Sequence, residues 1–91
     1  MKGIANMKTF EYVIKDELGI HARPAGNLAK LAKTFDSSIT IEKGDKNANA
    51  AKLLALMGMG IKCGDKITVK AEGNDEEKAI MDMQKFFSEN L

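Results

Sequence analysis

The chain has 91 residues, of which 44% are hydrophobic and 30% charged, and its formal net charge is +1. This length allows one domain with a modest core, and the balanced charge with few aromatic residues argues against a nucleic-acid-binding surface. The single cysteine excludes an internal disulfide and fits a reducing compartment. The longest apolar run, residues 53–61, is too short to span a bilayer, and residues 1–6 lack the apolar stretch of a signal peptide. We therefore expect a cytoplasmic protein without membrane insertion.

A strand is the first predicted element. Residues 8–14 alternate, so that Phe10, Tyr12 and Ile14 share one face of an extended chain. Residues 15–19 break this pattern, and a helix then begins close to His21. Its apolar positions recur at helical spacing: Ala25, Leu28, Ala29 and Ala32. The two patterns predict a half-buried strand followed by an amphipathic helix.

A hairpin follows the first helix. Residues 38–43 alternate again, Gly44-Asp45 suits a tight turn, and residues 46–49 return as a short polar strand. The polar character of the returning strand predicts that it lies at the edge of the sheet. A later strand completes the set with three inward residues: Ile67, Val69 and Ala71.

The last predicted helix begins after Gly73. Asn74 as the N-cap, with Glu77 three residues later, resembles a capping box, and acidic residues suit the first turn of a helix. An apolar stripe follows: Ala79, Ile80, Met83, Phe86 and Phe87. The element order is therefore β-α-β-β-α-β-α. It predicts an α+β fold with a four-stranded, mainly antiparallel sheet that helices cover on one face.

The strongest candidate site lies at the start of the first predicted helix, just after the loop that follows the first strand. The only histidine, His21, stands three residues before the only proline, Pro24. Proline fits the first turn of a helix, which places His21 at or beside the N-cap and leaves the backbone amides of Ala22 and Arg23 unpaired. Free amides at the positive end of a helix dipole form an anion site. The Arg23 guanidinium adds a planar pair of donors that suits phosphate or carboxylate.

These residues predict that His21 accepts a phosphoryl group, whose oxygens the helix start and Arg23 hold. Histidine is a covalent nucleophile, and phosphoryl transfer depends mainly on positioning and charge stabilisation. In the competing interpretation, His21 only caps the helix and Arg23 only interacts with water. The residues alone leave both open. One histidine and one cysteine make a metal site improbable, and no cofactor is expected.

A second candidate region is the apolar segment around residues 53–59. We expect Asn49 to cap a short helix over about residues 51–57, which Gly58 or Gly60 would end. The apolar residues are too many for one short helix to bury, and exposed apolar residues with methionine indicate a docking surface. In the alternative, Leu56 and Met59 belong to the core and the others are ordinary surface residues.

The segment Gly19-Ile20-His21-Ala22-Arg23-Pro24-Ala25 resembles the active-site signature of HPr, the phosphocarrier family of the bacterial phosphoenolpyruvate:sugar phosphotransferase system. The apolar pattern from Met7 to about Glu89 is similar to that family without a gap, and residues 53–60 resemble its second signature. The resemblance implies an open-faced β-sandwich. It also implies that His21 receives a phosphoryl group from enzyme I, at Nδ1, and passes it to sugar-specific IIA proteins.

The resemblance further implies a contact surface for those partners. By position it consists of Ala22, Arg23, Lys30, Lys33, Lys52, Leu53, Leu54 and Met57. The lysines would steer acidic partners. Many Gram-positive relatives carry a regulatory serine where this chain has Lys52, so that branch of regulation is in doubt here.

We therefore interpret residues 7–91 as a phosphocarrier domain that follows an extension over residues 1–6. We expect a monomer that acts as a carrier rather than as a turnover catalyst. Two alternatives stay open. One is a carrier in a non-sugar, nitrogen-related phosphorelay, and the other is an HPr-like regulatory binding module in which His21 is not phosphorylated.

Overall fold

The structure, a computed structural model, describes residues 7–91, and the predicted extension over residues 1–6 lies outside them. The elements are β1 (Lys8–Val13), α1 (Ala22–Ala32), β2 (Ser38–Lys43), β3 (Lys46–Asn49), α2 (Leu53–Gly58), β4 (Lys66–Glu72) and α3 (Glu76–Asn90). This order is the predicted one. Within residues 7–91, no helix has the length and apolar character needed to cross a membrane.

The four strands form one sheet in the order β1-β4-β2-β3, and every neighbouring pair is antiparallel. Because side chains alternate along a strand, the register decides which residues meet on each face. One row of apolar residues crosses the whole sheet: Phe10, Val69, Ile41 and Ala48. The short polar strand β3 lies at the edge, as predicted.

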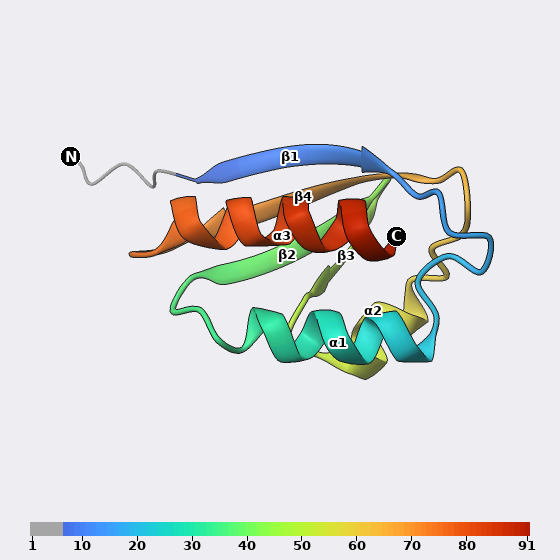
Figure 1. The fold of residues 1–91 in the computed structure, drawn as a ribbon, viewed down its shortest axis with the longest axis horizontal. Helices are drawn as coiled ribbons and strands as arrows, with labels where there is room; N and C mark the ends of the chain where they lie inside the picture. The colour runs from blue at the N-terminus through green and yellow to red at the C-terminus, as the bar shows by residue number, and fades with distance from the viewer. Residues whose placement is uncertain (1–6) are drawn as a thin grey trace.

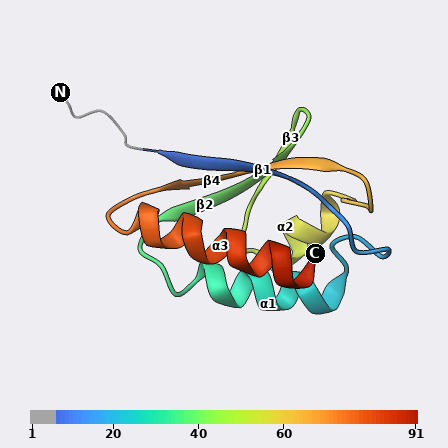
Figure 2. The ribbon, with the colours of Figure 1, turned by 45° about the horizontal axis from the view of Figure 1, so that its top comes forward.

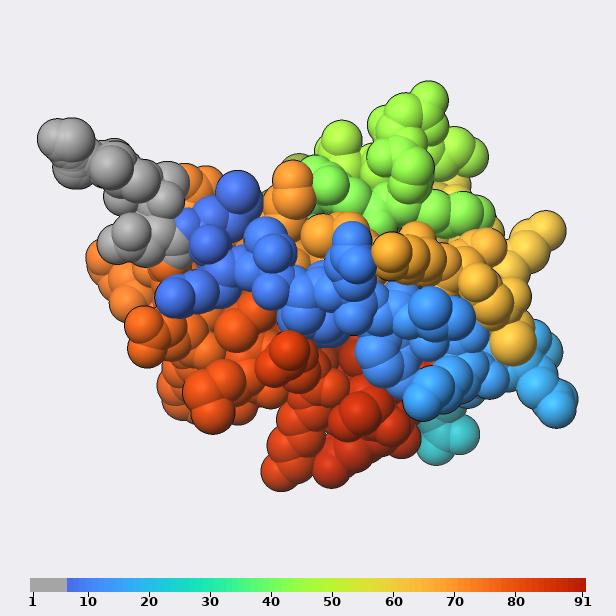
Figure 3. All heavy atoms as spheres, turned by 90° about the horizontal axis from the view of Figure 1, so that it is seen from above, coloured from blue at the N-terminus to red at the C-terminus, as the bar shows by residue number. Residues whose placement is uncertain are grey.

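Helices α1 and α3 lie on one side of this sheet (Figures 1 and 2), and their predicted apolar stripes are buried in one core. Phe87 of α3 is fully buried, and its ring meets the rings of Phe10 and Tyr12 edge-on at centroid distances of 5.8 and 5.5 Å. Burial of such a side chain stabilises the fold by about 1.5–3 kcal/mol. The opposite face of the sheet is open, and β1 crosses it in blue in Figure 3. The fold is therefore the predicted open-faced sandwich.

The short helix starts later than predicted. The Asn49 side chain closes a turn, because its Oδ1 accepts a hydrogen bond from the Ala51 amide at 2.8 Å. Helix α2 then begins at Leu53 with Lys52 as its N-cap and ends with Met59 as its C-cap. The prediction that Asn49 caps the helix is wrong, because an asparagine side chain can close a turn with the same acceptor that it would use in a cap.

The predicted capping box at the start of α3 is also wrong. The N-cap is Asp75, and the glutamate that reaches back is Glu76, whose Oε1 accepts a hydrogen bond from the Gly73 amide at 3.0 Å. The Asp75 carboxylate accepts hydrogen bonds from the Ser37 hydroxyl and from the amides of Ser37 and Asp36. These bonds, the Ser37 hydroxyl first, lower the pKa of Asp75 below its usual value. The side chain of the N-cap residue therefore binds a loop that is distant in sequence, at residues 36 and 37, instead of capping α3.

Candidate phosphoryl-transfer site

The loop before His21 is built around a glycine that no other residue can replace without strain. Gly19 has a φ of +68°, and a Cβ added there would lie 2.3 Å from the Ile61 carbonyl oxygen. The next residue uses this close approach, because the Ile20 amide donates to the same oxygen at 3.1 Å. The segment before His21 therefore packs closely against the backbone of residues 61 and 62, which follow α2.

Hydrogen bonds to Leu91 and within the loop hold its other end. The amides of Lys15 and Asp16 donate to the Leu91 carbonyl oxygen at 2.6 and 2.9 Å. Within the loop, Asp16 Oδ1 accepts from the Leu18 amide at 2.8 Å, and the Asp16 carbonyl accepts from the Gly19 amide at 2.9 Å. Residues 15–20 thus form a fixed support for the histidine.

His21 is the N-cap of α1, as predicted from Pro24. Its backbone is extended, with φ −99° and ψ −175°, and its carbonyl accepts a hydrogen bond from the Ala25 amide at 2.9 Å. Its ring makes no capping hydrogen bond to the helix. The imidazole is half-buried and takes no part in stabilising the first turn, so its nitrogens remain available for chemistry.

The imidazole lines a small, shallow hollow formed by Asp16, His21, Arg23, Pro24, Asn27 and Asn90. The Arg23 side chain is exposed and makes no ion pair within residues 7–91. The first amides of α1, those of Ala22 and Arg23, have no acceptor within the helix. A planar cation, two unpaired amides and the positive end of an 11-residue helix therefore stand beside one imidazole. This set of donors suits the oxygens of a phosphoryl group.

Three of the predicted docking residues lie on the exposed face of α2. Helix α2 packs against α1 (Figure 1), and the exposed fractions of Leu53, Leu54 and Met57 are 39%, 83% and 42%. The neighbouring Leu56 and Met59 are buried in the core. One apolar face of α2 thus anchors the helix, and the other lies open to solvent. The alternative interpretation named Leu56 and Met59 as core residues, and both are buried. The docking role of the exposed face stays a prediction.

Three of the predicted contact residues are lysines: one lies on α1, and the others are the C-cap of α1 and the N-cap of α2. Lys30, Lys33 and Lys52 are exposed, and none of them forms an ion pair within the described chain. The four ion pairs of residues 7–91 all lie elsewhere: Lys43–Asp65, Lys66–Glu11, Lys70–Glu42 and Lys78–Asp82. The charges of these three lysines are therefore available to an outside partner.

Sequence reasoning missed four residues near the histidine: Asp16, Leu18, Asn27 and Asn90. Asn27 stands one turn after Arg23 on α1, so helical spacing was a usable signal. Leu18 is an apolar residue in a turn, where it has no strand or helix face to join. Asn90 lies at the far end of the sequence, and only the fold brings it to this hollow.

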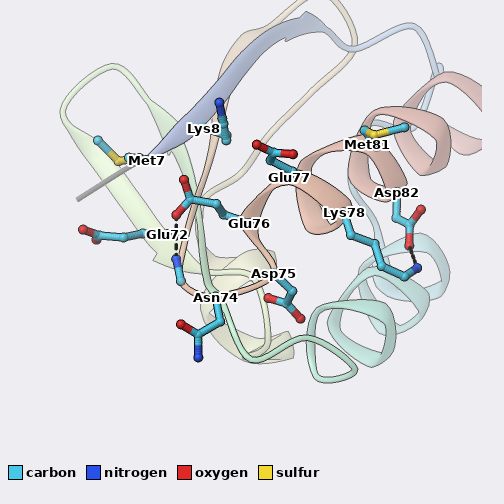
Figure 4. A pocket seen from close by; sticks show the side chains of 11 residues that line it. Met7, Lys8, Glu72, Asn74, Asp75, Glu76, Glu77, Lys78, Met81 and Asp82 are labelled. Atoms are coloured by element: carbon cyan, nitrogen blue, oxygen red, sulfur yellow. Dashed lines mark hydrogen bonds and ion pairs between the residues drawn. The ribbon is translucent and has the colours of Figure 1, made fainter. Parts of the chain in front are cut away.

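A larger hollow lies at the other end of α3 (Figure 4). It is lined by Met7, Lys8, Glu72, Gly73, Asn74, Asp75, Glu76, Glu77, Lys78, Met81 and Asp82. Much of its charge is used inside the chain, because Lys78 pairs with Asp82 at 2.9 Å and the carboxylates of Asp75 and Glu76 hold backbone amides. It is a broad acidic depression without a nucleophile, about 20 Å from His21 along a 15-residue helix.

Comparison with known proteins gives one consistent result. The sequence model of a family described as "PTS HPr component phosphorylation site" matches residues 8–89. A phosphocarrier protein HPr of Mycoplasma capricolum is 46% identical over 74 residues, which cover 81% of this chain and 83% of that protein. The histidine-containing phosphocarrier protein of a Mycoplasma aligns with a TM-score of 0.88 at 40% identity, covering 90% and 93% of the two chains. HPr from Bacillus anthracis aligns with a TM-score of 0.84 at 30% identity, covering 90% and 98%.

Proposed function

The chain belongs to the HPr family of phosphocarrier proteins, and we propose on that basis that His21 is the residue that carries the phosphoryl group. The observation that supports this assignment most directly is the state of the His21 ring. It is half-exposed at the start of α1, it makes no capping bond, and it shares a hollow with Arg23. A nucleophile in that position can be reached from outside by a large partner.

The reaction is an exchange of one phosphorus–nitrogen bond for another. The Nδ1 atom of a neutral His21 attacks the phosphorus of a phosphohistidine on the donor protein, and the donor's phosphorus–nitrogen bond breaks as the new bond forms. The departing nitrogen keeps its electron pair. The amides of Ala22 and Arg23 and the Arg23 guanidinium stabilise the negative oxygens during transfer. In the second transfer, the bond between His21 Nδ1 and the phosphorus breaks as the acceptor protein bonds to the phosphorus.

The donor in this proposal is enzyme I, and the acceptors are IIA proteins that serve sugar uptake. Both must reach the same nitrogen, so both must cover the surface around it. That surface offers exposed apolar residues on α2 and unpaired lysines on α1, which suit partners with an apolar centre and carboxylates around it. The contact residues are Ala22, Arg23, Lys30, Lys33, Lys52, Leu53, Leu54 and Met57.

The chain acts here as a carrier that is consumed and regenerated, not as a catalyst with its own turnover. We place this reaction in the cytoplasm. The exposed free thiol of Cys63 supports a reducing compartment.

The decisive experiment is phosphoryl transfer from labelled phosphoenolpyruvate in the presence of enzyme I. We expect the wild-type chain to acquire a label that is lost in acid and stable in base, and His21→Ala to acquire none. Arg23→Ala should take up or release the label roughly 10- to 100-fold more slowly, because one charged donor is lost in the transition state. A His21→Ala variant that is labelled like the wild type would instead favour the binding-module alternative.

A further inference from the structure

Seven large hydrophobic side chains are exposed within residues 7–91, and six of them lie on the sheet, on α2 or at the acidic hollow. Met7 and Met81 line the acidic hollow, Val13 lies on the open face of the sheet, and three others form the exposed face of α2. The remaining one is Leu18. Its exposed fraction is 71%, second only to the 83% of Leu54.

Leu18 stands in the fixed turn that supports the histidine. Its own amide is held by Asp16 Oδ1, and the following amide is held by the Asp16 carbonyl. The turn is fastened at one side to the Leu91 carbonyl and at the other to the Ile61 carbonyl. An apolar side chain on such a turn loses little backbone freedom when a partner covers it, so its burial contributes to affinity with a small entropic cost.

The turn also lies beside the end of α2. The backbone of Gly19 approaches Ile61 and Lys62, which follow α2 by only a few residues. Leu18 is three residues before His21, a separation of at most about 10 Å along the chain. A protein partner of standard size covers about 800 Å² on each side, which corresponds to a radius of about 16 Å. Leu18 is therefore close enough to His21 for one partner to contact both residues.

We propose that Leu18 is a second apolar anchor for the proteins that exchange phosphoryl groups with His21. It complements the exposed face of α2. This inference rests on the proposed function, because it concerns the same partners. The occupant is a protein with an apolar recess that receives the leucine while its phosphorylated or accepting histidine meets His21. An apolar side chain that a partner covers contributes to affinity through the apolar area removed from water.

The test measures how fast enzyme I phosphorylates the carrier as the carrier concentration varies. Leu18→Ser should raise KM about five- to tenfold and leave kcat within about twofold, because the lost contact is the same in the ground state and the transition state. Leu18→Met should restore a KM close to the wild-type value, since it is apolar and of similar volume. Met81→Ser is the matched control. It removes an equally exposed apolar side chain from the acidic hollow, and its KM should be unchanged.

The outcomes separate this inference from the proposed function. A wild-type chain that takes no label from enzyme I would contradict the proposed function itself. A wild-type chain that is labelled normally, with Leu18→Ser showing an unchanged KM and an unchanged melting temperature, would overturn the anchor alone. A rise in KM of the same size for Leu18→Ser and Met81→Ser would also overturn it, because the effect would then not depend on position.

Discussion

The two ends of α3 use charge in opposite ways. At its first turn, the acidic hollow is wide, but its carboxylates hold the amides of residues 36, 37 and 73, and its lysine Lys78 pairs with Asp82. At its last turn, Asn90 borders a much smaller hollow in which Arg23 has no ion pair within the described residues and the His21 ring makes no capping bond. Groups that the fold does not use are free to act on a partner.

Under the proposed function, the smaller of the two hollows is the one that acts. The larger hollow is a place where two loops are joined, and its polar groups contribute to the fold. The smaller one is shallow, which suits a carrier because a partner protein must reach the ring from outside. The proposed chemistry uses the His21 imidazole and the amide donors that have no acceptor within α1.

The largest effect is expected from a change in the support of the site. Gly19→Ala should lower the free energy of unfolding by at least about 2 kcal/mol, because it combines a left-handed backbone with a contact against the Ile61 carbonyl. Gly44→Ala is the matched control, since Gly44 has a φ of +60° and no atom within 4 Å of the added Cβ. It should cost only about 1 kcal/mol. Urea denaturation measures both, and equal losses would show that the contact at Gly19 carries no energy.

A smaller effect should distinguish the surface near His21 from the acidic hollow at the other end of α3, in the binding of enzyme I. Leu54→Glu should raise the KM for transfer from enzyme I about tenfold, equivalent to about 1.4 kcal/mol, because it places a charge in the apolar contact. With 83% of its surface exposed, Leu54 contributes little to the core, so the melting temperature should stay near the wild-type value. Met81→Glu in the acidic hollow should change neither quantity. If Met81→Glu raises KM as much as Leu54→Glu does, enzyme I does not distinguish the exposed face of α2 from the acidic hollow.

The smallest effect concerns the acidic end alone and appears only in acid. The lowered pKa of Asp75 means that its carboxylate stabilises the fold above about pH 4, and this contribution is lost as pH falls through the lowered pKa. Asp75→Asn keeps an acceptor oxygen but removes the titration. The stability of the wild type should therefore fall more steeply between about pH 5 and pH 2 than that of the variant. Urea denaturation at several pH values measures this, and transfer at neutral pH should be unaffected.

Local patterns predicted most of the fold. Alternation placed Ile39 and Ile41 inward, helical spacing identified the apolar stripe that ends at Phe87, and Pro24 located the start of α1 within one residue. These features depend on residues that are close in the chain, so local sequence patterns are enough to predict them. The error at Asn49 arose where one polar side chain had two possible backbone partners. The error at Asn74 arose because the next residue, Asp75, is the N-cap and its carboxylate binds the backbone of residues 36 and 37. Competition of that kind is decided by the surroundings.

The site was predictable in part for the same reason. His21, Ala22 and Arg23 are consecutive, and the roles proposed for them depend on the start of one helix. Asn90 and Asp16 border the same hollow from elements far apart in sequence, and nothing in their local pattern indicated it. Whether Lys30 and Lys33 were free or paired depended on which acidic residues the fold placed near them.

The sequence alone determined the seven elements, their inward faces and the presence of an imidazole at the start of a helix, because each of these follows from periodicity or from a few adjacent residues. Only the tertiary structure decided which polar groups are left without an internal partner, which leucines stay exposed, and which distant segments hold the histidine in place. Those outcomes depend on contacts between residues far apart in the chain, and such contacts exist only after the layers have packed together.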